Sequence, residues 1–257
     1  PVAGVWTVGE GEVSLPRCAG ARDRRYGKLL LVDTENGQPV GAPRYVDDFS
    51  ALPVRDFDMP WPESIKGVTC PVGVDDLVAL GVKYADTNVG ISGLIDWRNP
   101  DPAVTWEVDG RKIGINMGYV RGFDEHIKQM NAAGINVTLI LLNMVPTQPE
   151  PGNPLIHPKT DLANAPNHLG AFNLTDEEGL LHYRAAVEFL ADRYSQPSGE
   201  HGWVSGYIIG NELQAHWWWH NMGHVSYEDL VTEYAKQLRV AYTAIRRYHG
   251  KVRVYLS

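Results

Sequence analysis

Hydrophobic and polar positions repeat along the chain from residue 64 onward, in a unit made of a helical stretch and a short apolar stretch. Near-continuous apolar runs are typical of parallel strands that are covered by helices on both faces of a sheet. The strands that this pattern predicts are Ile65–Thr69, Tyr84–Val89, Asn136–Leu142, Val204–Ile209 and Val252–Leu256. The alternation therefore predicts an α/β fold built on a parallel sheet.

Four helices are predicted between these strands, from the spacing of apolar residues and from signals at the helix ends. They are Val74–Leu80, Phe123–Ala133, a helix that begins at the capping box Thr175–Glu178, and Ser226–Tyr248. Gly81 and Gly134 follow the first two helices, where a helix end favours a residue with positive φ. A hairpin-like insertion is expected around Asp109–Gly110, and the long loop after Leu142 is predicted to be a lid or a site wall.

Five strands and four helices in strict alternation make up a little over half of a (β/α)8 barrel of the TIM type. A parallel sheet that ended at the fifth strand would expose a long edge of unpaired backbone groups. We therefore expect the remaining strands in a natural C-terminal continuation or in a second polypeptide that completes the barrel. An open sheet is the alternative.

The N-terminal part of the chain has a different pattern, because it is rich in Pro and Gly. Strand-like runs at Gly11–Leu15 and Lys28–Val32 are separated by turn residues such as Glu35-Asn36-Gly37. We predict a small β-rich arm at residues 1–62 and the N-terminal part of the barrel at residues 63–257. Pro60-Trp61-Pro62 is expected to be a stiff joint between them, since each Pro restricts φ.

Composition and charge exclude several classes of partner. The chain has 257 residues, a formal net charge of −8 and a pI near 5.6, so it offers no basic field to a nucleic acid. No apolar run is long enough for a membrane span, and Pro1–Gly4 lacks a signal-peptide pattern, so any export signal has been removed or never existed. Cys18 and Cys70 form either one disulfide or two free thiols.

Reactive groups in parallel α/β folds gather at the carboxyl ends of the strands. That rule selects Asn88, Asn143, and Asn211 with Glu212, as candidate site residues. Glu212 follows an apolar strand and precedes an aromatic run, and such surroundings raise the pKa of a carboxyl group toward that of a general acid. The alternative for Glu212 is a salt bridge or a charge at a helix N-terminus.

The aromatic run consists of Trp217, Trp218 and Trp219, flanked by His216 and His220. Flat apolar rings with polar tips suit sugar stacking, and we predict that these five residues contact a carbohydrate. At least one of the three tryptophans is expected in the core, because neighbouring side chains point in different directions.

The histidines at 216, 220 and 224 recur every four residues, a spacing that could bind zinc on a helix. No nearby Cys or well-placed Asp completes such a site, and Gly223 interrupts the helix. We therefore predict no metal and no cofactor.

Gly210-Asn211-Glu212 at the end of the fourth predicted strand resembles the Asn-Glu signature of a clan of retaining (β/α)8 glycoside hydrolases. That clan includes cellulases, mannanases and β-galactosidases, and the resemblance covers roughly residues 64–257. Further similar segments are Lys66-Gly67-Val68, Leu80-Gly81-Val82, Ala133-Gly134-Ile135 and Phe189–Tyr194. This chain departs from the clan at Leu213–His216, where Pro or another short residue usually follows the Glu.

The resemblance implies roles for both residues of the signature. Glu212 would be the acid/base, and Asn211 would hydrogen-bond the sugar 2-hydroxyl next to the scissile bond. The nucleophile would be a Glu at the end of a seventh strand, which this chain does not contain. We therefore assign no nucleophile and expect the chain alone to be inactive.

Arg44-Tyr45-Val46 is similar to a bacterial group of secreted glycosidase-like proteins, which implies a secreted or periplasmic location. The leading hypothesis is a retaining glycoside hydrolase that cleaves a β-linked oligo- or polysaccharide with Glu212 as general acid/base and water as co-substrate. The alternatives are a non-catalytic carbohydrate-binding barrel and a metal-dependent hydrolase that uses the histidines.

Overall fold

A computed structural model of the chain describes residue 4, residues 13–71 and residues 73–257. The chain divides into two compact units, Pro1–Ala51 and Leu52–Ser257. Pro1–Ala3, on which the expectation about a signal peptide depended, lie outside the described residues. So do Gly11 and Glu12 of the strand predicted at Gly11–Leu15.

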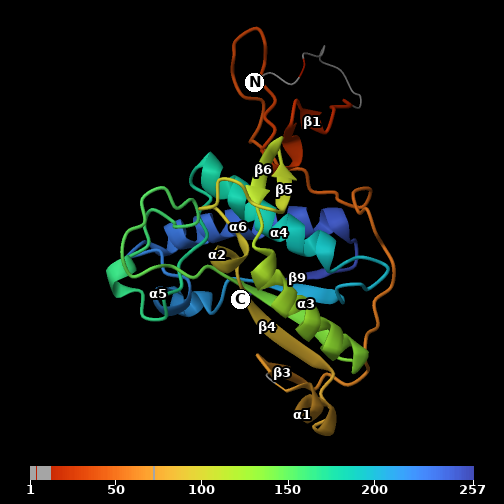
Figure 1. Cartoon of the computed structure of the whole chain (residues 1–257). Coiled ribbons are helices and arrows are strands. Elements are labelled where there is room, and N and C mark those ends of the chain that lie inside the picture. Colours follow the sequence, from red (N-terminus) through yellow and green to blue (C-terminus); the bar gives the residue numbers. More distant parts are fainter. Residues whose placement is uncertain (1–3, 5–12, 72) are drawn as a thin grey trace. The chain divides into compact units, whose positions relative to one another are not determined.

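The larger unit is built on a parallel sheet of five strands, which Figure 1 shows from one side. In order across the sheet, the strands are β3 (Gly67–Thr69), β4 (Tyr84–Gly90), β7 (Asn136–Leu142), β8 (Val204–Ile209) and β9 (Arg253–Leu256). All four neighbouring pairs are parallel. Each strand lies beside the one that precedes it in the alternation, which is the order of a barrel and not that of a doubly wound sheet. The predicted first five strands of a (β/α)8 barrel are confirmed.

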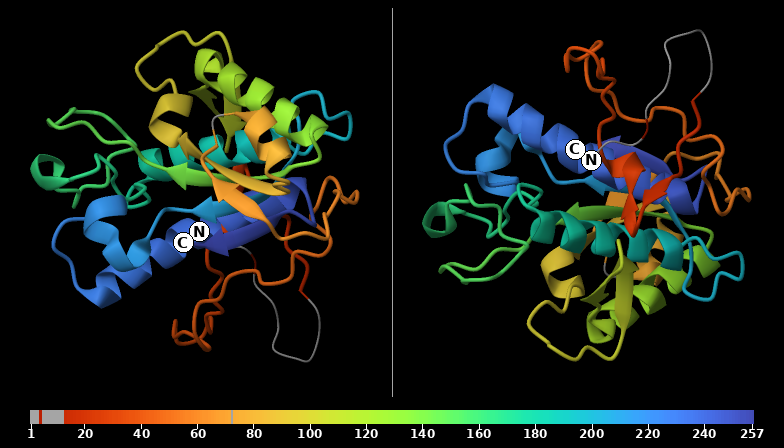
Figure 2. Two further views of the ribbon diagram at one scale, coloured as in Figure 1. Left: turned by 90° about the horizontal axis from the view of Figure 1, so that it is seen from below. Right: turned by 90° about the horizontal axis from the view of Figure 1, so that it is seen from above.

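Helices connect these strands. They are α1 (Val74–Ala79), α2 (Ile91–Leu94), α3 (Met117–Ala132), α4 (Glu177–Arg193), α5 (His216–Trp219) and α6 (Tyr227–Tyr248). In the right-hand view of Figure 2, α4 lies between α3 and α6. A hairpin of β5 (Thr105–Val108) and β6 (Arg111–Gly114) follows α2, with positive φ at Asp109 and Gly110, as the turn signal predicted.

Two predicted helix starts need correction. Helix α3 begins at Met117, earlier than the predicted Phe123, and the Asn116 side chain accepts a hydrogen bond from the Tyr119 N–H. The glycines in its first turns lower helix propensity and weaken the apolar pattern there. Helix α4 is capped by Asp176, whose carboxylate accepts from the Gly179 N–H at 2.7 Å, and not by Thr175.

The core lies between the sheet and the helices. On the central strand β7, Val137, Leu139 and Leu141 are fully buried against the helices. On the opposite face of β7, Ile140 and Leu142 pack with Leu169 of the long loop. Beyond that cluster the same face of the sheet is open, and a groove of about 640 Å³ runs along it. The groove is lined by Gly67, Val68, Thr69, Tyr84, Ala85, Asp86, Thr138, Ile208, Tyr255 and Leu256.

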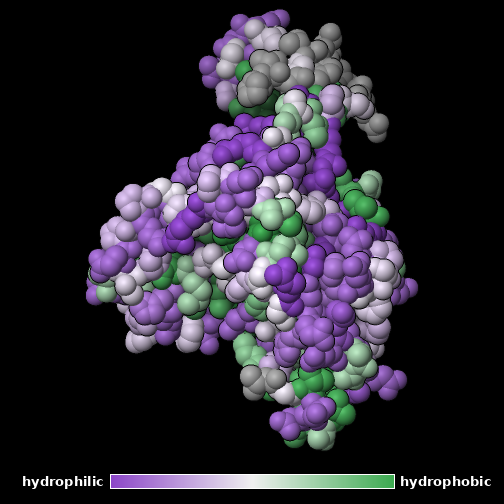
Figure 3. Space-filling model, viewed as in Figure 1, coloured by the Kyte–Doolittle hydropathy of each residue, from purple (hydrophilic) through white to green (hydrophobic). Residues whose placement is uncertain are grey.

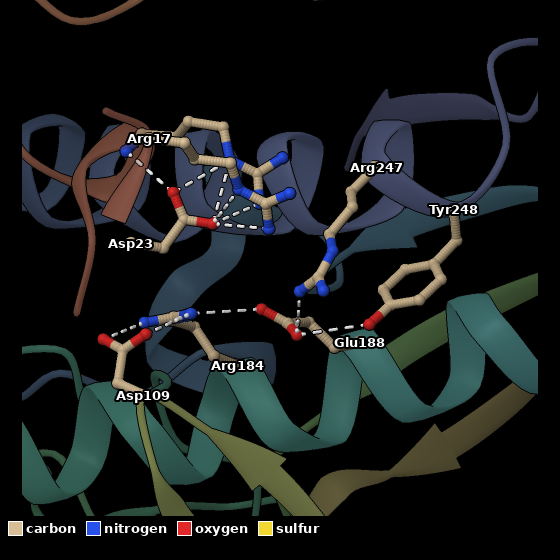
Figure 4. A network of polar contacts seen from close by, with 8 residues as sticks. Arg17, Asp23, Asp109, Arg184, Glu188, Arg247 and Tyr248 are labelled. Carbon is tan, nitrogen blue, oxygen red and sulfur yellow. Dashed lines mark hydrogen bonds and ion pairs between the residues drawn. The ribbon is translucent and has the colours of Figure 1, made fainter. Parts of the chain in front are cut away.

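A buried polar network joins α4 to α6 and to the hairpin (Figure 4). Arg184 pairs with Asp109 at 2.8 Å and with Glu188 at 3.2 Å. Glu188 also accepts from Arg247 at 3.0 Å and from the Tyr248 hydroxyl at 3.4 Å. Arg184 and Glu188 are buried charges that are compensated by these partners, so the network fixes how the two helices pack.

Residues 52–62 pack within the larger unit. The backbone N–H of Val54 donates to the carbonyl oxygen of Arg247 at 2.8 Å, and the Arg55 guanidinium pairs with Asp192 at 2.8 Å. The Trp61 ring lies beneath Arg253, with the guanidinium carbon 4.0 Å from the ring centroid. None of the helices in the described ranges is long and apolar enough to cross a membrane.

The smaller unit contains a short antiparallel pair, β1 (Cys18–Ala19) and β2 (Arg22–Asp23), followed by the turn η1 (Arg24–Tyr26). The strand predicted at Lys28–Val32 is wrong, because Leu29 and Val32 form isolated bridges only. Their side chains and those between them are exposed, so no core face orders the segment as a strand.

Candidate active site at the carboxyl ends of the strands

Glu212 lies at the carboxyl end of β8, after Gly210 and Asn211. Its side chain is exposed, whereas Asn211 is half-buried. Glu212 has φ 40° and ψ 60°, and it precedes the short turn η3 (Leu213–Ala215). A left-handed conformation is costly for a residue with a Cβ, and such strain is concentrated at functional sites. The backbone therefore turns sharply at Glu212, away from the line of the strand.

Strained residues gather at this edge of the sheet. Among the described residues, the non-glycine positions with positive φ are Cys70, Asp109, His168 and Glu212. Cys70 directly follows β3, and the carbonyl oxygen of His168 accepts from the Val145 N–H just beyond β7. Three of the four thus lie around the carboxyl ends of the strands, where the sequence placed the chemistry.

Asn88 and Asn143 occupy different positions relative to their strands. Asn88, selected as a residue of the carboxyl end of its strand, is exposed and lies inside β4, in register with Ile140, so it does not follow its strand. The pairing continues through Val89 to Gly90, the residue after the predicted end of the strand. Asn143 follows β7 as predicted and is buried.

The Asn143 side chain holds the long loop, residues 143–176. Its Nδ2 donates to the carbonyl oxygens of Leu155, at 2.7 Å, and Ala171, at 3.0 Å. Its Oδ1 is buried without a hydrogen-bond partner in the described part of the chain. The amide therefore fastens two distant points of the loop beside the end of β7.

The three tryptophans of α5 have three different surroundings. Trp217 stacks on His224, with ring centroids 4.2 Å apart and an interplanar angle of 23°. Trp219 packs against the apolar cluster of Ile140, Leu142 and Leu169. Trp218 is 52% exposed. As expected from their adjacency, one ring contributes to the core, and Trp218 presents a free apolar face.

The flanking histidines also differ. His216 is half-buried. His220 is buried, and its Nε2 lies 2.8 Å from Gln237 Oε1. Since Gln237 donates its Nε2 to the carbonyl oxygen of Phe172, its Oε1 is the acceptor and His220 is the donor. Burial lowers the pKa of His220 to about 4.

The periodic histidines do not share a helix face, because α5 ends at Trp219 and His224 lies beyond it. Across residues 13–71 and 73–257, no group of three or more His, Cys, Asp or Glu side chains is arranged to hold a metal ion. The thiols of Cys18 and Cys70 are free and exposed.

Two residues that the sequence did not mark contribute to the frame of the site. The Tyr234 hydroxyl donates to the carbonyl oxygen of Ile209 at 2.7 Å and accepts from the Ser257 N–H at 3.3 Å, so it links the ends of β8 and β9. Asn221 is fully buried between the long loop and α5. The spacing of apolar residues predicted the helix at Ser226–Tyr248 but no role for Tyr234, and no sequence signal marked Asn221.

Five parallel strands in sequential order, with these polar groups at their carboxyl ends, define the class of the protein as a partial (β/α)8 fold. The chain belongs to a family of unknown function (DUF5722), whose model matches residues 58–257. No curated protein matches the chain.

Two solved structures are similar to the chain. The β-glycosidase from the hyperthermophile Thermosphaera aggregans is 18% identical, with a TM-score of 0.42, and the match covers 71% of this chain and 41% of that one. Endo-glycoceramidase II from Rhodococcus sp., in a cellobiose-like imidazole complex, is 13% identical, with a TM-score of 0.44 and coverage of 72% and 43%. The chain thus spans about two fifths of the length of either structure.

Proposed function

We propose that this chain carries the acid/base half of a retaining glycoside hydrolase that cleaves a β-linked oligo- or polysaccharide, with Glu212 as the proton donor. The observation that supports this most is the position of Glu212. Its exposed carboxyl group follows the fourth parallel strand on a left-handed backbone, at the edge where barrel enzymes place their chemistry.

The chemistry requires a carboxylic acid that protonates the departing glycosidic oxygen while an oxocarbenium-like centre develops. Glu212 would donate that proton and later accept one from the attacking water. Asn211 would hydrogen-bond the sugar 2-hydroxyl, an interaction that strengthens in the transition state. The nucleophile would be a second carboxylate about 5 Å from Glu212, which is the spacing of retaining enzymes.

Sugar binding is assigned to the polar and aromatic residues around Glu212. Trp218 offers an exposed ring for stacking, and the partly buried Trp217 and His216 lie beside it on α5. Among the remaining candidates, Asn143 and His220 are buried, Trp219 is half-buried and Asn88 is exposed within β4. These four residues would shape the wall of the site.

The nucleophile would come from strands that complete the barrel, in a C-terminal continuation or a second polypeptide. The support for this is apolar surface at the two outer strands, where Val68 on β3 is 37% exposed and Leu256 on β9 is 67% exposed. In the view of Figure 3, hydrophobic side chains also gather over α1, beside β3. A polysaccharide substrate implies that the protein is secreted or periplasmic, which cell fractionation would test.

The test is Glu212→Gln in the full-length protein, assayed on cello- and manno-oligosaccharides and on aryl β-glycosides. Loss of the proton donor should lower kcat on oligosaccharides by about 10²–10⁴-fold. A dinitrophenyl glycoside should be affected much less in its glycosylation step, because its leaving group departs without protonation. Glu125→Gln, which changes an exposed carboxylate on α3, is the matched control and should be fully active.

Full activity of Glu212→Gln on oligosaccharides would refute the assigned role. Binding of oligosaccharides by the wild-type protein without any turnover would instead support the non-catalytic carbohydrate-binding barrel.

A further inference from the structure

Asn221 has an unusually complete set of side-chain hydrogen bonds for a residue that is 0% exposed. Its Oδ1 accepts from the backbone N–H groups of Asp161 and Gly223, both at 3.0 Å. Its Nδ2 donates to the carbonyl oxygen of Trp217 at 3.1 Å. The side chain therefore binds one point of the long loop and two points of the segment that contains α5.

The backbone of Asn221 binds the same loop at three further points. Its N–H donates to the carbonyl oxygen of Leu169 at 3.0 Å. Its carbonyl oxygen accepts from the Ala171 N–H at 2.9 Å and from the Thr160 hydroxyl at 3.1 Å. Asn221 thus connects separate stretches of residues 143–176 to the chain that follows Glu212.

The bond to Trp217 restrains the backbone from which the Trp218 side chain projects. The carbonyl oxygen of Trp217 belongs to the planar peptide group that also carries the Trp218 nitrogen. Helix α5 has only four residues, and a helix of that length has little stability of its own. The position of α5, and with it the backbone that carries the exposed Trp218 ring, therefore depends on contacts outside α5.

The long loop is also connected to the segment after α2, and this connection is much weaker. Arg98, in the segment after α2, pairs with Glu150 of the loop, but the Arg98 side chain is 63% exposed. Exposed ion pairs contribute little, whereas buried hydrogen-bonding groups are costly to leave without partners. The hydrogen bonds of Asn221 therefore hold the long loop more strongly than the Arg98–Glu150 ion pair does.

We propose that Asn221 is a positioning residue that fixes α5 against the long loop and thereby orients the Trp218 ring for sugar binding. This inference rests on the proposed function for its sugar ligand, a β-linked oligosaccharide. The fixing of α5 is a separate claim about the chain itself.

The first experiment measures backbone hydrogen exchange in full-length Asn221→Asp and Asn221→Ala. Asn221→Asp keeps the acceptor for Asp161 and Gly223 but loses the donor to Trp217, and it adds a buried negative charge that lowers global stability. After the rates are corrected for that loss, measured by urea unfolding, exchange should be accelerated about tenfold or more in residues 217–220 only. Asn221→Ala should accelerate exchange in residues 160–171 as well. Should it fail to fold, the aspartate variant still decides the matter.

The matched control is Asn153→Ala. Asn153 lies in the same loop and also makes two side-chain hydrogen bonds, to Glu150 and to the Leu155 N–H, but none to α5. Exchange in residues 217–220 should be unchanged in this variant. If exchange in residues 217–220 is unchanged in Asn221→Asp, or is accelerated equally in Asn221→Asp and Asn153→Ala, the claim that Asn221 fixes α5 is wrong.

The second experiment is a double-mutant cycle on oligosaccharide hydrolysis, with Asn221→Asp, Trp218→Ala and the combined variant. Asn221→Asp should raise KM about five- to tenfold with kcat within about twofold, because it disturbs binding and not proton transfer. In the combined variant KM should be no higher than in Trp218→Ala, since Asn221 acts through that ring. Independent, multiplying effects on KM would overturn the orienting role.

The two claims fail in different ways. If the wild-type protein neither binds nor cleaves any of these sugars, the proposed function and the orienting role fail together. Hydrogen exchange still decides, without any sugar, whether Asn221 fixes α5.

Discussion

At the residue scale, burial determines which protonation state the histidines adopt in the folded chain. His220 is buried beside α6, and its Nε2 donates to Gln237, so a second proton would place a charge in an apolar wall. Burial lowers its pKa to about 4, and it also lowers the pKa values of His157, His182 and His249. The neutral form of each ring is the one that the fold favours.

The protein should lose stability as the pH falls from about 6.5 to about 4. In this window the unfolded chain binds a proton at His220 and the folded chain does not, so acid favours unfolding. Above about pH 6.5 neither state binds that proton, and the stability that the neutral His220 contributes is fully present. His220 alone should account for a loss on the order of 2–3 kcal/mol. Urea unfolding at several pH values measures this, and His220→Gln should reduce the pH dependence. An equal reduction in the control His224→Gln, an exposed histidine nearby, would contradict the assignment to His220.

At the scale of elements, the packing of α4 against α6 depends on a carboxylate inside the helix pair. Glu188 is 1% exposed and accepts from Arg184, Arg247 and Tyr248. Its proximity raises the pKa of the Tyr248 hydroxyl, together with burial, which is the larger cause. A buried carboxylate is tolerated only where such partners surround it, so the pair of helices has one preferred alignment.

Glu188→Ala should lower the free energy of unfolding by about 3 kcal/mol, because it removes a buried carboxylate that the buried Arg184, the half-buried Arg247 and the Tyr248 hydroxyl share, although Arg184 keeps its pair with Asp109. The matched control is Glu178→Ala on the same helix, where the carboxylate pairs with Arg111 in an exposed position. That change should cost less than about 1 kcal/mol. Urea denaturation measures both, and equal losses would show that burial does not set the strength of the Glu188 network.

At the scale of the whole molecule, the outer strands carry apolar surface that the inner strands bury. Leu256 on β9 is in register with Ile209 on β8, which in turn is in register with Leu141 on β7. Ile209 and Leu141 are 0% exposed beneath helices, whereas Leu256 is 67% exposed. Leu256 therefore occupies the position that a further helix of a complete barrel would cover.

If the strands and helices of the proposed complete barrel cover Leu256, Leu256→Asp in the protein that contains them should lower the free energy of unfolding by about 2 kcal/mol, because a charge would replace an apolar group at that contact. Val231→Asp on α6, at a side chain that is 44% exposed, is the control and should change it by less than about 0.5 kcal/mol. Thermal or urea denaturation measures both. A neutral effect of Leu256→Asp would contradict the covering of this edge.

The strands were predictable because a parallel strand beneath helices needs a continuous apolar run. Asn136–Leu142 and Val204–Ile209 form strands with the predicted bounds. The end of β4 at Gly90 was predicted as Val89, one residue early, whereas the start of α3 was not predictable, since glycines weaken its apolar pattern. Lys28–Val32 has a strand-like composition but no core to pack against, so tertiary context overrode propensity.

The candidate site was only partly predictable. Position after a strand identified Glu212, but its left-handed backbone has no signature in a Gly-Asn-Glu segment. Adjacency predicted that the tryptophans would differ, yet not that Trp218 would be the exposed one and Trp219 the packed one. Asn221 could not be found at all, because its partners lie in residues that are distant in sequence.

The sequence by itself determined the alternation of strands and helices, the order of the parallel sheet and the place of Glu212 beyond β8. These depend on local periodicity and on the handedness of connections, which short stretches of chain specify. Only the tertiary structure decided which ring faces solvent, which histidine is buried and which amide holds the long loop. Those properties arise from burial and hydrogen bonds between residues far apart in the chain, and no local pattern contains them.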